Sequence, residues 1–264
     1  MRLFFFHPFL TRAPWLAAAT LGALTIGCDA PTRQPAAAAA TPTAAPLTRP
    51  AASVDAYALD TVRLDQEVSA QRLMVHTAYP RLRPLAGTLP TDTVGIGAFN
   101  KAAKKLVVSL VKEIEATARE NRPQQLSSGL NVTFKSYALR QGLASVAFTV
   151  TQDGIGPRPL TWATGLTYDL RTGRQLTPAD LFQQTPAFRQ AVLAALQPLL
   201  DGSDDCEYEP SNMSWDNFSL GPTAYYLLLG DPQVGRACPT REVAVPLKQL
   251  QAFANPRSPA VRFR

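Results

Sequence analysis

The chain has 264 residues, of which 46% are hydrophobic and 17% are charged, and its formal net charge is +6. This composition is typical of a globular protein, and no run of Lys and Arg reaches the density expected of a nucleic-acid-binding surface. The chain holds three cysteines and two histidines, too few for an obvious metal site. We therefore expect no nucleic-acid partner, no metal and no other cofactor.

Residues 1–27 have the pattern of an export signal. Arg2 and Arg12 accompany an apolar run over residues 13–26, which is shorter than the roughly 20 residues of a membrane-spanning helix. The small residue Gly27 precedes Cys28, and this arrangement resembles a bacterial lipoprotein signal, in which the cysteine is lipidated and becomes the new N-terminus. The alternative is an ordinary secretory signal with a chance cysteine. In either case we expect the mature chain to leave the cytoplasm, with its charge lowered from +6 to +4 by the loss of both arginines.

Residues 28–55 have the composition of a disordered tether. Between residues 29 and 52 there are ten alanines, five prolines and four threonines, which cannot bury enough apolar surface to offset the entropy of ordering. A lipid on Cys28 would anchor this tether to a membrane. We therefore expect a protein of the bacterial cell envelope, facing the periplasm or the exterior, with one folded domain over residues 56–264.

The first half of this domain shows one strand and one long helix. A β-prone run over residues 72–79 ends at Pro80, and a stretch rich in Gly and Pro follows over residues 84–97. Apolar residues then recur at the helical period over residues 99–118, with lysines on the opposite face. We interpret the lysine stripe as the solvent-exposed side of an amphipathic helix, with an anionic surface as the alternative partner.

The second half shows more strands. We expect strands over 131–139, 143–152 and 160–170, with a tight turn at Gln141-Gly142. A helix should start at Thr177-Pro178-Ala179-Asp180 and another at Thr185-Pro186, which Pro198 should kink or end. Strands over 216–220, 225–229 and 242–245 and a closing helix over 246–254 complete the pattern. Because strands and helices are segregated, we expect a single α+β domain with antiparallel sheets and a few amphipathic helices.

If Cys28 carries lipid, an even pair remains, Cys206 and Cys238. Disulfides persist in an oxidising compartment, so we expect these two residues to be bonded, with two unpaired thiols as the alternative. Closing this loop would stabilise the fold by about 3–4 kcal/mol on the chain-entropy model.

The order of elements resembles that of RsiV-like extracytoplasmic domains. The segment Val75-His76-Thr77-Ala78-Tyr79-Pro80, followed by Phe99-Asn100-Lys101-Ala102, is similar to their opening strand and helix. The most distinctive stretch is Tyr168-Asp169-Leu170-Arg171-Thr172-Gly173-Arg174-Gln175-Leu176-Thr177, where a strand ends in Asp-Leu and a Thr-Gly turn follows. The resemblance covers about residues 56–255.

Such domains occur in an anti-sigma factor that senses lysozyme, beside a peptidoglycan deacetylase, and in lipoproteins of unknown role. The resemblance implies a module that binds or senses a ligand at the cell wall. About a dozen residues precede the apolar run, so we expect no sigma-factor-binding segment. Arg158 stands where the family tends to have a histidine, and we include it among the candidate ligand-binding residues.

No catalytic pattern stands out. His76 is the one histidine after residue 28, and we expect it to be packed or half-exposed rather than part of a Ser-His-Asp system. The sequence contains no Gly-x-Ser-x-Gly, His-Glu-x-x-His or phosphate-binding glycine loop. Glu113 and Glu115 point to different faces of the predicted helix, so they do not form a paired acid and base.

A dense acidic segment surrounds Cys206. Its carboxylates suit a basic protein such as a lysozyme, and Trp215 lies nearby as a possible ligand contact. The candidate ligand-binding residues are Asp204, Asp205, Glu207, Glu209, Trp215 and Arg158.

We predict a non-catalytic envelope lipoprotein that binds a lysozyme-like protein or a peptidoglycan-derived ligand. The alternatives are an envelope hydrolase or deacetylase accessory domain, and a purely structural envelope protein.

Overall fold

The computed structural model describes residues 57–86, 88, 90–154, 158–200, 215–230, 241–259 and 261. The chain divides into the units Met1–Arg49 and Pro50–Arg264, and every described residue belongs to the second. Its strands are β1 (Tyr57–Val68), β2 (Leu73–Pro84), β3 (Ser128–Arg140), β4 (Leu143–Asp153), β5 (Leu160–Asp169), β6 (Arg174–Gln175), β7 (Phe218–Leu220), β8 (Ala224–Leu229) and β9 (Arg241–Pro246). Its α-helices are α1 (Pro90–Asn121), α2 (Pro178–Leu181), α3 (Pro186–Leu200) and α4 (Leu247–Leu250).

The strands form two sheets. The larger sheet has the order β1-β2-β3-β4-β5-β6 and the smaller one the order β7-β8-β9. Every neighbouring pair is antiparallel except β2 and β3, which run parallel. Parallel neighbours need a crossover connection, and α1 supplies it. A single α+β domain is therefore confirmed, whereas the expectation of purely antiparallel sheets is wrong for this pair.

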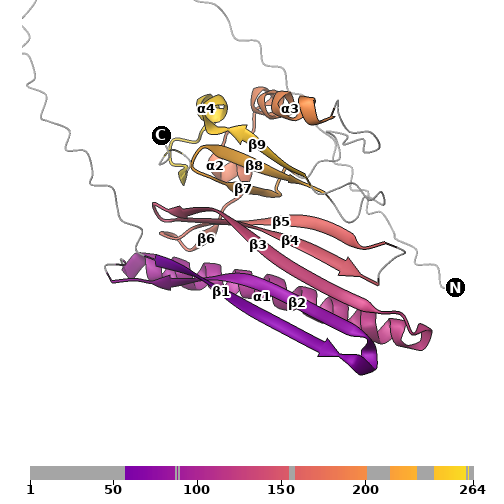
Figure 1. Ribbon diagram of the computed structural model, residues 1–264. Helices are drawn as coiled ribbons and strands as arrows, with labels where there is room; N and C mark the ends of the chain where they lie inside the picture. Colours follow the sequence, from indigo (N-terminus) through magenta and orange to yellow (C-terminus); the bar gives the residue numbers. More distant parts are fainter. Residues whose placement is uncertain are drawn as a thin grey trace, which may run out of the picture. The chain divides into compact units, whose positions relative to one another are not determined.

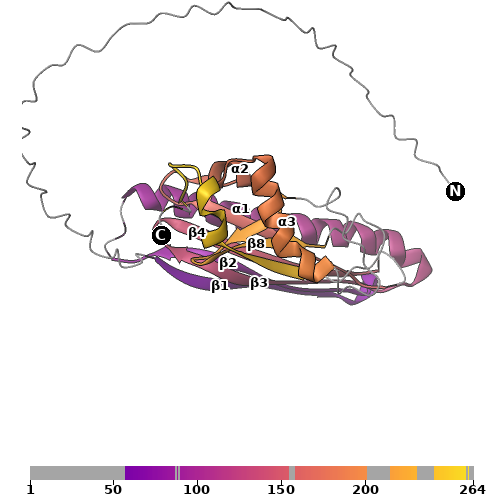
Figure 2. The ribbon, with the colours of Figure 1, turned by 90° about the horizontal axis from the view of Figure 1, so that it is seen from above.

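These elements stack in layers. Helix α1 covers one face of the larger sheet, and the smaller sheet lies against the opposite face over β3, β4 and β5 (Figure 1). Helices α3 and α4 pack on the far side of the smaller sheet, as the view from above also shows (Figure 2). Two sheets and two helical layers thus share three interfaces.

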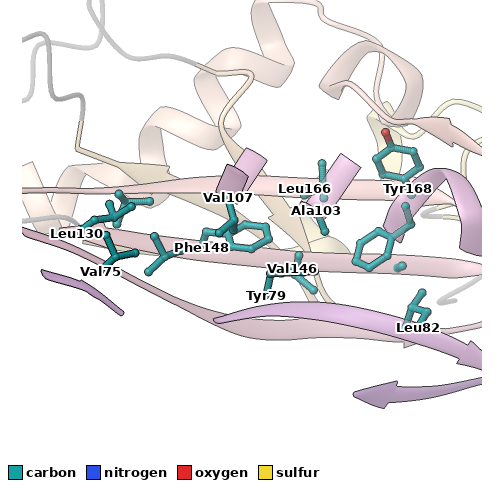
Figure 3. Packing of buried hydrophobic residues seen from close by; sticks show 14 of the residues in the cluster. Val75, Tyr79, Leu82, Ala103, Val107, Leu130, Val146, Phe148, Leu166 and Tyr168 are labelled. Atoms are coloured by element: carbon teal, nitrogen blue, oxygen red, sulfur yellow. The ribbon is translucent and has the colours of Figure 1, made fainter. Parts of the chain in front are cut away.

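The principal core lies between α1 and the larger sheet. Phe99, Ala103 and Val107 follow one face of α1 and are fully buried, and Figure 3 shows the labelled Ala103 and Val107 beside the strand residues Val146 and Phe148. Lysines on the other face of α1 are exposed, as the helical period predicts. A second core joins α2, α3, α4 and the smaller sheet, with aromatic side chains in contact at Phe182, Phe188, Phe218 and Tyr225.

The side chain of Asn100 completes β2 where its neighbouring strand leaves it. Strand β3 pairs with β2 from Leu73 to Thr77. Beyond that point the Leu82 N–H donates to Asn100 Oδ1 at 2.7 Å, and Asn100 Nδ2 donates to the Leu82 carbonyl at 2.8 Å. The amide therefore takes the place of a strand, which satisfies backbone groups that burial would otherwise penalise. Pairing with β1, together with this support, lets β2 continue through Pro80, where we had expected it to end.

A second asparagine joins the two sheets. Asn217 Oδ1 accepts a hydrogen bond from the Gly165 N–H at 2.9 Å, and Asn217 Nδ2 donates to the carbonyls of Ala163 at 2.8 Å and Leu228 at 3.0 Å. The strands approach so closely here that a Cβ on Gly165 would lie 1.8 Å from the Phe218 carbonyl oxygen. The amide of Asn217 and the missing side chain of Gly165 therefore both contribute to the contact between the sheets.

The start of α1 also differs from the sequence prediction. Residues 90–97 belong to α1, although their Gly and Pro content indicated turns. Pro198 lies inside α3, which ends two residues later at Leu200. Tight turns were predicted correctly, since Gln141 and Gly142 have φ angles of 56° and 74°, as a two-residue hairpin turn requires.

Candidate ligand groove

The stretch after β5 is a hairpin turn held by its own first residue. Asp169 is 7% exposed, its Oδ1 accepts from the Arg171 N–H at 3.2 Å, and its carbonyl accepts from the Gly173 N–H at 2.8 Å. Gly173 has a φ angle of +67°, which glycine adopts without strain. The Asp-Leu-x-Thr-Gly pattern is therefore explained by the geometry of this turn.

A helix cap follows directly. The Asp180 carboxylate accepts hydrogen bonds from the Thr177 N–H and the Thr177 hydroxyl, both at 2.8 Å, and it pairs with the Arg174 guanidinium. Pro178 occupies the first helical position of α2. The capping residues predicted from the sequence are confirmed, and this cap also positions Arg174.

The C-terminal segment lies against this hairpin and helix. Asn255 Nδ2 donates to the Ala179 carbonyl at 2.7 Å, and the Asn255 N–H donates to the Leu181 carbonyl at 3.0 Å. Phe182 and Ala254 form an isolated antiparallel bridge. These contacts bring a segment that is far away in the sequence next to the turn after β5.

An open groove of about 670 Å³ lies between the C-terminal segment and the turn after β5 with α2. Its walls combine charged, polar and small apolar residues, namely Asp169, Thr172, Arg174, Leu176, Ala179, Asp180, Asn255, Pro256, Arg257, Ser258 and Pro259. Both carboxylates hold structural contacts, because Asp169 organises the turn and Asp180 caps α2. Within the described residues, Arg257 makes no ion pair and is exposed. Since Arg174 is paired with Asp180, Arg257 is the lining cation that could meet a negatively charged ligand.

Asp180 should stabilise the fold at neutral pH more than in acid. Its side chain is 23% exposed. Burial raises the pKa of this carboxyl, but hydrogen bonds from Thr177 and the charge of Arg174 outweigh burial and lower the pKa overall. A carboxyl whose pKa is lowered by folding adds stability above its unfolded pKa of about 4, and this contribution is lost as the pH falls through the folded pKa.

We therefore expect Asp180→Asn to lower the free energy of unfolding by about 1 kcal/mol at pH 7. The difference from the unaltered chain should shrink as the pH falls below about 4. Urea denaturation of both chains over a pH series measures this, and a difference that stays constant into strong acid would contradict it.

Two of the sequence-predicted site residues lie in the described part of the chain, and neither lines the groove. Trp215 is half-buried and packs against the second core, and its carbonyl accepts from the Tyr225 hydroxyl at 3.0 Å. Arg158 is exposed just before β5. The remaining predicted residues, Cys28, Cys206, Cys238, Asp204, Asp205, Glu207 and Glu209, lie outside the described residues.

The other titratable residues considered from the sequence are dispersed. His76 lies on β2 with a side chain that is 61% exposed, and its Nδ1 is 3.4 Å from Asp65 Oδ1. In the described part of the chain, no three His, Cys, Asp or Glu side chains gather as metal ligands would. None of the helices in this part is both long and apolar enough to cross a membrane.

A polar and aromatic cluster lies where the two sheets diverge. Lys135 Nζ is 3.1 Å from both carboxylate oxygens of Glu242 and 4.6 Å from the centre of the Tyr137 ring. Tyr137 stands at a β-bulge in β3, and its ring centre is 4.6 Å from that of Tyr226. Burial, followed by the Glu242 carboxylate, raises the pKa of the Tyr137 hydroxyl. This cluster joins β3 of the larger sheet to β8 and β9 of the smaller sheet. Because its charged groups neutralise one another, it is a weaker candidate for a ligand site.

Comparison with known proteins identifies the fold. No family model matches the chain, and no curated protein matches it significantly. The structure is similar to a crystal structure of a DUF3298 family member from Bacteroides fragilis, with a TM-score of 0.55 and 12% identity over 79% of this chain and 98% of that one. It is also similar to a DUF3298 family protein from Pseudomonas aeruginosa, with a TM-score of 0.52 and 13% identity over 77% and 97% of the two chains.

The chain is thus a single α+β domain with the fold of DUF3298 family proteins. At these identities the similarity establishes the fold alone. The finer resemblance to RsiV-like domains stays a prediction.

None of the groove residues was predicted from the sequence as a ligand-binding residue. Asp169, Thr172, Arg174 and Asp180 were noticed for their turn and cap patterns, whereas Asn255, Arg257 and Ser258 attracted no attention. The segment Asn255–Pro259 has the composition of a turn. No local pattern indicates that this turn lies against α2.

Proposed function

We propose that this protein is a lipid-anchored, non-catalytic binding module of the bacterial cell envelope. Its ligand is a peptidoglycan-derived peptide with free carboxylates, held in the groove between the turn after β5 and the C-terminal segment. The observation that carries the proposal is the exposed Arg257, which makes no ion pair in the described part of the chain and lines a groove whose two carboxylates already hold structural contacts.

The chemistry of the groove supports a carboxylate ligand. A guanidinium presents several N–H donors in one plane, which match the two oxygens of a carboxylate. Thr172 and Asn255 add hydroxyl and amide groups along the walls, and Leu176 and Ala179 add a small apolar surface. Wall peptides combine carboxylates, amides and short aliphatic side chains, and the groove offers a partner for each of these groups.

The groove carboxylates support binding rather than proton transfer. A general acid or base works best with a pKa near the operating pH. The pKa of Asp180 is lowered, because the hydrogen bonds from Thr177 and the charge of Arg174 outweigh burial. Asp169 is committed to the turn through Arg171. The predicted export signal over residues 1–27, with a lipid on Cys28, would place this groove where wall fragments are found.

Removing the Arg257 charge should weaken ligand binding. We expect Arg257→Gln to raise the dissociation constant for a muropeptide tripeptide by about tenfold or more, because a charge-assisted hydrogen bond contributes about 1.5–3 kcal/mol. Isothermal titration calorimetry on the full chain in detergent measures this. Arg119→Gln is the matched control, since Arg119 is exposed at the end of α1 and does not line the groove.

The ligand offers a second control. A tripeptide with amidated carboxylates should bind the unaltered chain as weakly as the free acid binds the Arg257→Gln variant. The proposal fails if neither peptide binds at millimolar concentration, or if the Arg257 and Arg119 variants bind equally well.

A protein ligand is the other partner predicted from the sequence. The acidic residues assigned to a lysozyme-like protein lie between 201 and 209, outside the described residues, so this prediction rests on charge alone. It predicts that neutralising these acids weakens binding of a basic lysozyme at low salt.

A further inference from the structure

The outer edge of β1 carries charges of both signs and lacks the lysines, prolines and bulges that protect many sheet edges. Among the described residues, β2 is the one strand that pairs with β1, and the pairing runs from Tyr57 to Val68 without a register shift. Edge strands are commonly protected by charged side chains, lysine above all, by prolines or by bulges. Strand β1 contains no lysine, proline or bulge, and its charged residues Asp60, Arg63, Asp65 and Glu67 are of both signs. In contrast, side-chain amides of Asn100 and Asn217 cover the edges of β2 and β5.

The backbone groups that face outward from β1 follow from the hydrogen bonds of β2. The N–H and carbonyl of Leu82 point away from β1, toward Asn100, so Leu82 and its partner Leu59 form a non-hydrogen-bonded pair. Such pairs alternate with hydrogen-bonded pairs along an antiparallel ribbon. The N–H and carbonyl groups of Thr61, Arg63 and Asp65 therefore face outward.

These outward groups fit a second copy of β1. A two-fold axis perpendicular to the sheet and passing midway between the two copies of Leu64 would place Arg63 opposite Asp65 of the second copy, and Asp65 opposite its Arg63. Both residues of each pair face outward, so the pairs would be hydrogen-bonded. A shift of the axis to Arg63 or Asp65 would instead place like charges directly opposite each other, which destabilises a sheet.

The side chain at the centre of this register is apolar and accessible. Leu64 is 38% exposed, and it lies on the same face of the ribbon as its partner Thr77, which is the face toward α1. Two Leu64 side chains would bury one another on that face, while the Arg63 and Asp65 pairs would form on the opposite face. We propose that two copies of this chain associate through antiparallel pairing of their β1 edges, centred on Leu64.

Charge reversal tests the register. We expect Arg63→Asp to weaken dimerisation by about tenfold, since it replaces two attractive cross-strand pairs with two repulsive ones. Asp65→Arg should do the same, and the double variant should restore the affinity of the unaltered chain. Sedimentation equilibrium of the full chain in density-matched detergent measures this, with circular dichroism to confirm folding. A monomer at all concentrations overturns the proposal, as does a double variant no tighter than the single ones.

Cysteine cross-linking tests the axis directly. Residues that face each other in a non-hydrogen-bonded pair have Cα atoms about 4.5 Å apart, within the range of a disulfide. Leu64→Cys should therefore cross-link two chains on mild oxidation. Gln66→Cys is the matched control, because Gln66 is exposed on the same face of β1 and its copy would lie about four residues away along the strands. Equal cross-linking of both variants would overturn the proposed register.

Discussion

Alanine at Gly95 is expected to destabilise the protein by about 3 kcal/mol, whereas alanine at Gly97, two residues along the same helix, should stabilise it by about 1 kcal/mol. A Cβ on Gly95 would lie 1.8 Å from the Leu170 carbonyl oxygen, inside any allowed contact. Since that atom belongs to the backbone, α1 and the turn after β5 must separate to admit a methyl group. A Cβ on Gly97 meets nothing within 4 Å, so there the higher helix propensity of alanine remains.

The two variants are expected to change the free energy of unfolding in opposite directions, so a general effect of replacing glycine in α1 would not explain both results. Urea denaturation of both variants, with linear extrapolation to water, gives the two free energies of unfolding. The close approach of α1 to Leu170 would be contradicted if Gly95→Ala were as stable as Gly97→Ala. Leu170 directly follows Asp169, which lines the groove. Because a methyl group on Gly95 would displace Leu170, Gly95→Ala should also weaken muropeptide binding.

Loss of the Asn217 amide should cost about 3 kcal/mol, at roughly 1 kcal/mol for each hydrogen bond removed. Asn217→Ala removes the acceptor for Gly165 and the donor to Ala163 and Leu228. Asn217→Asp keeps the size of the side chain and the acceptor, but it turns a carboxylate oxygen toward two carbonyls. We expect this variant to be at least as unstable as the alanine variant at neutral pH.

Asn131→Ala is the matched control for this prediction. Asn131 is exposed on β3, and its loss should change the free energy of unfolding by less than about 0.5 kcal/mol. Equilibrium denaturation monitored by tryptophan fluorescence reports on the junction, because Trp215 lies two residues before Asn217. An Asn217→Ala variant as stable as Asn131→Ala would show that the amide does not hold the sheets together.

Local physical chemistry explains which elements could be predicted. The helical period of α1 follows from burial on one side, and its exposed lysines confirm that interpretation. The turn at Gln141-Gly142 and the cap at Thr177 depend on residues that are adjacent in the chain. In each case the preference of a short segment agrees with its final environment.

Strand β1 could not be predicted in this way. An edge strand with mixed exposure on both faces shows no alternation of apolar and polar residues. The parallel pairing of β2 with β3 was missed for a related reason, because strand order depends on how α1 packs and not on the strand residues themselves. Gly95 was likewise misinterpreted as a turn residue, because the need for glycine there comes from the close approach of the Leu170 backbone.

The candidate groove also contains residues of two kinds: some belong to local sequence patterns, and others are brought there by tertiary packing. Asp169, Gly173 and Asp180 belong to a turn and a cap that short-range hydrogen bonds define, so their pattern is visible in the sequence. Arg257 enters the groove because Asn255 bonds to the carbonyl of Ala179, 76 residues away in the chain. Contacts of that range are selected by packing of the whole domain, and no local preference encodes them.

Local sequence patterns were sufficient to predict the α+β class, the amphipathic helix, the turns and the caps, because each depends on the conformational preferences of neighbouring residues. The strand order, the junction of the sheets at Asn217 and Gly165, and the presence of Arg174 and Arg257 in one groove became visible in the folded domain alone. The reason is that a side-chain amide can replace a strand, and a glycine can admit another backbone, only where two distant segments have already been brought together by burial of their apolar faces.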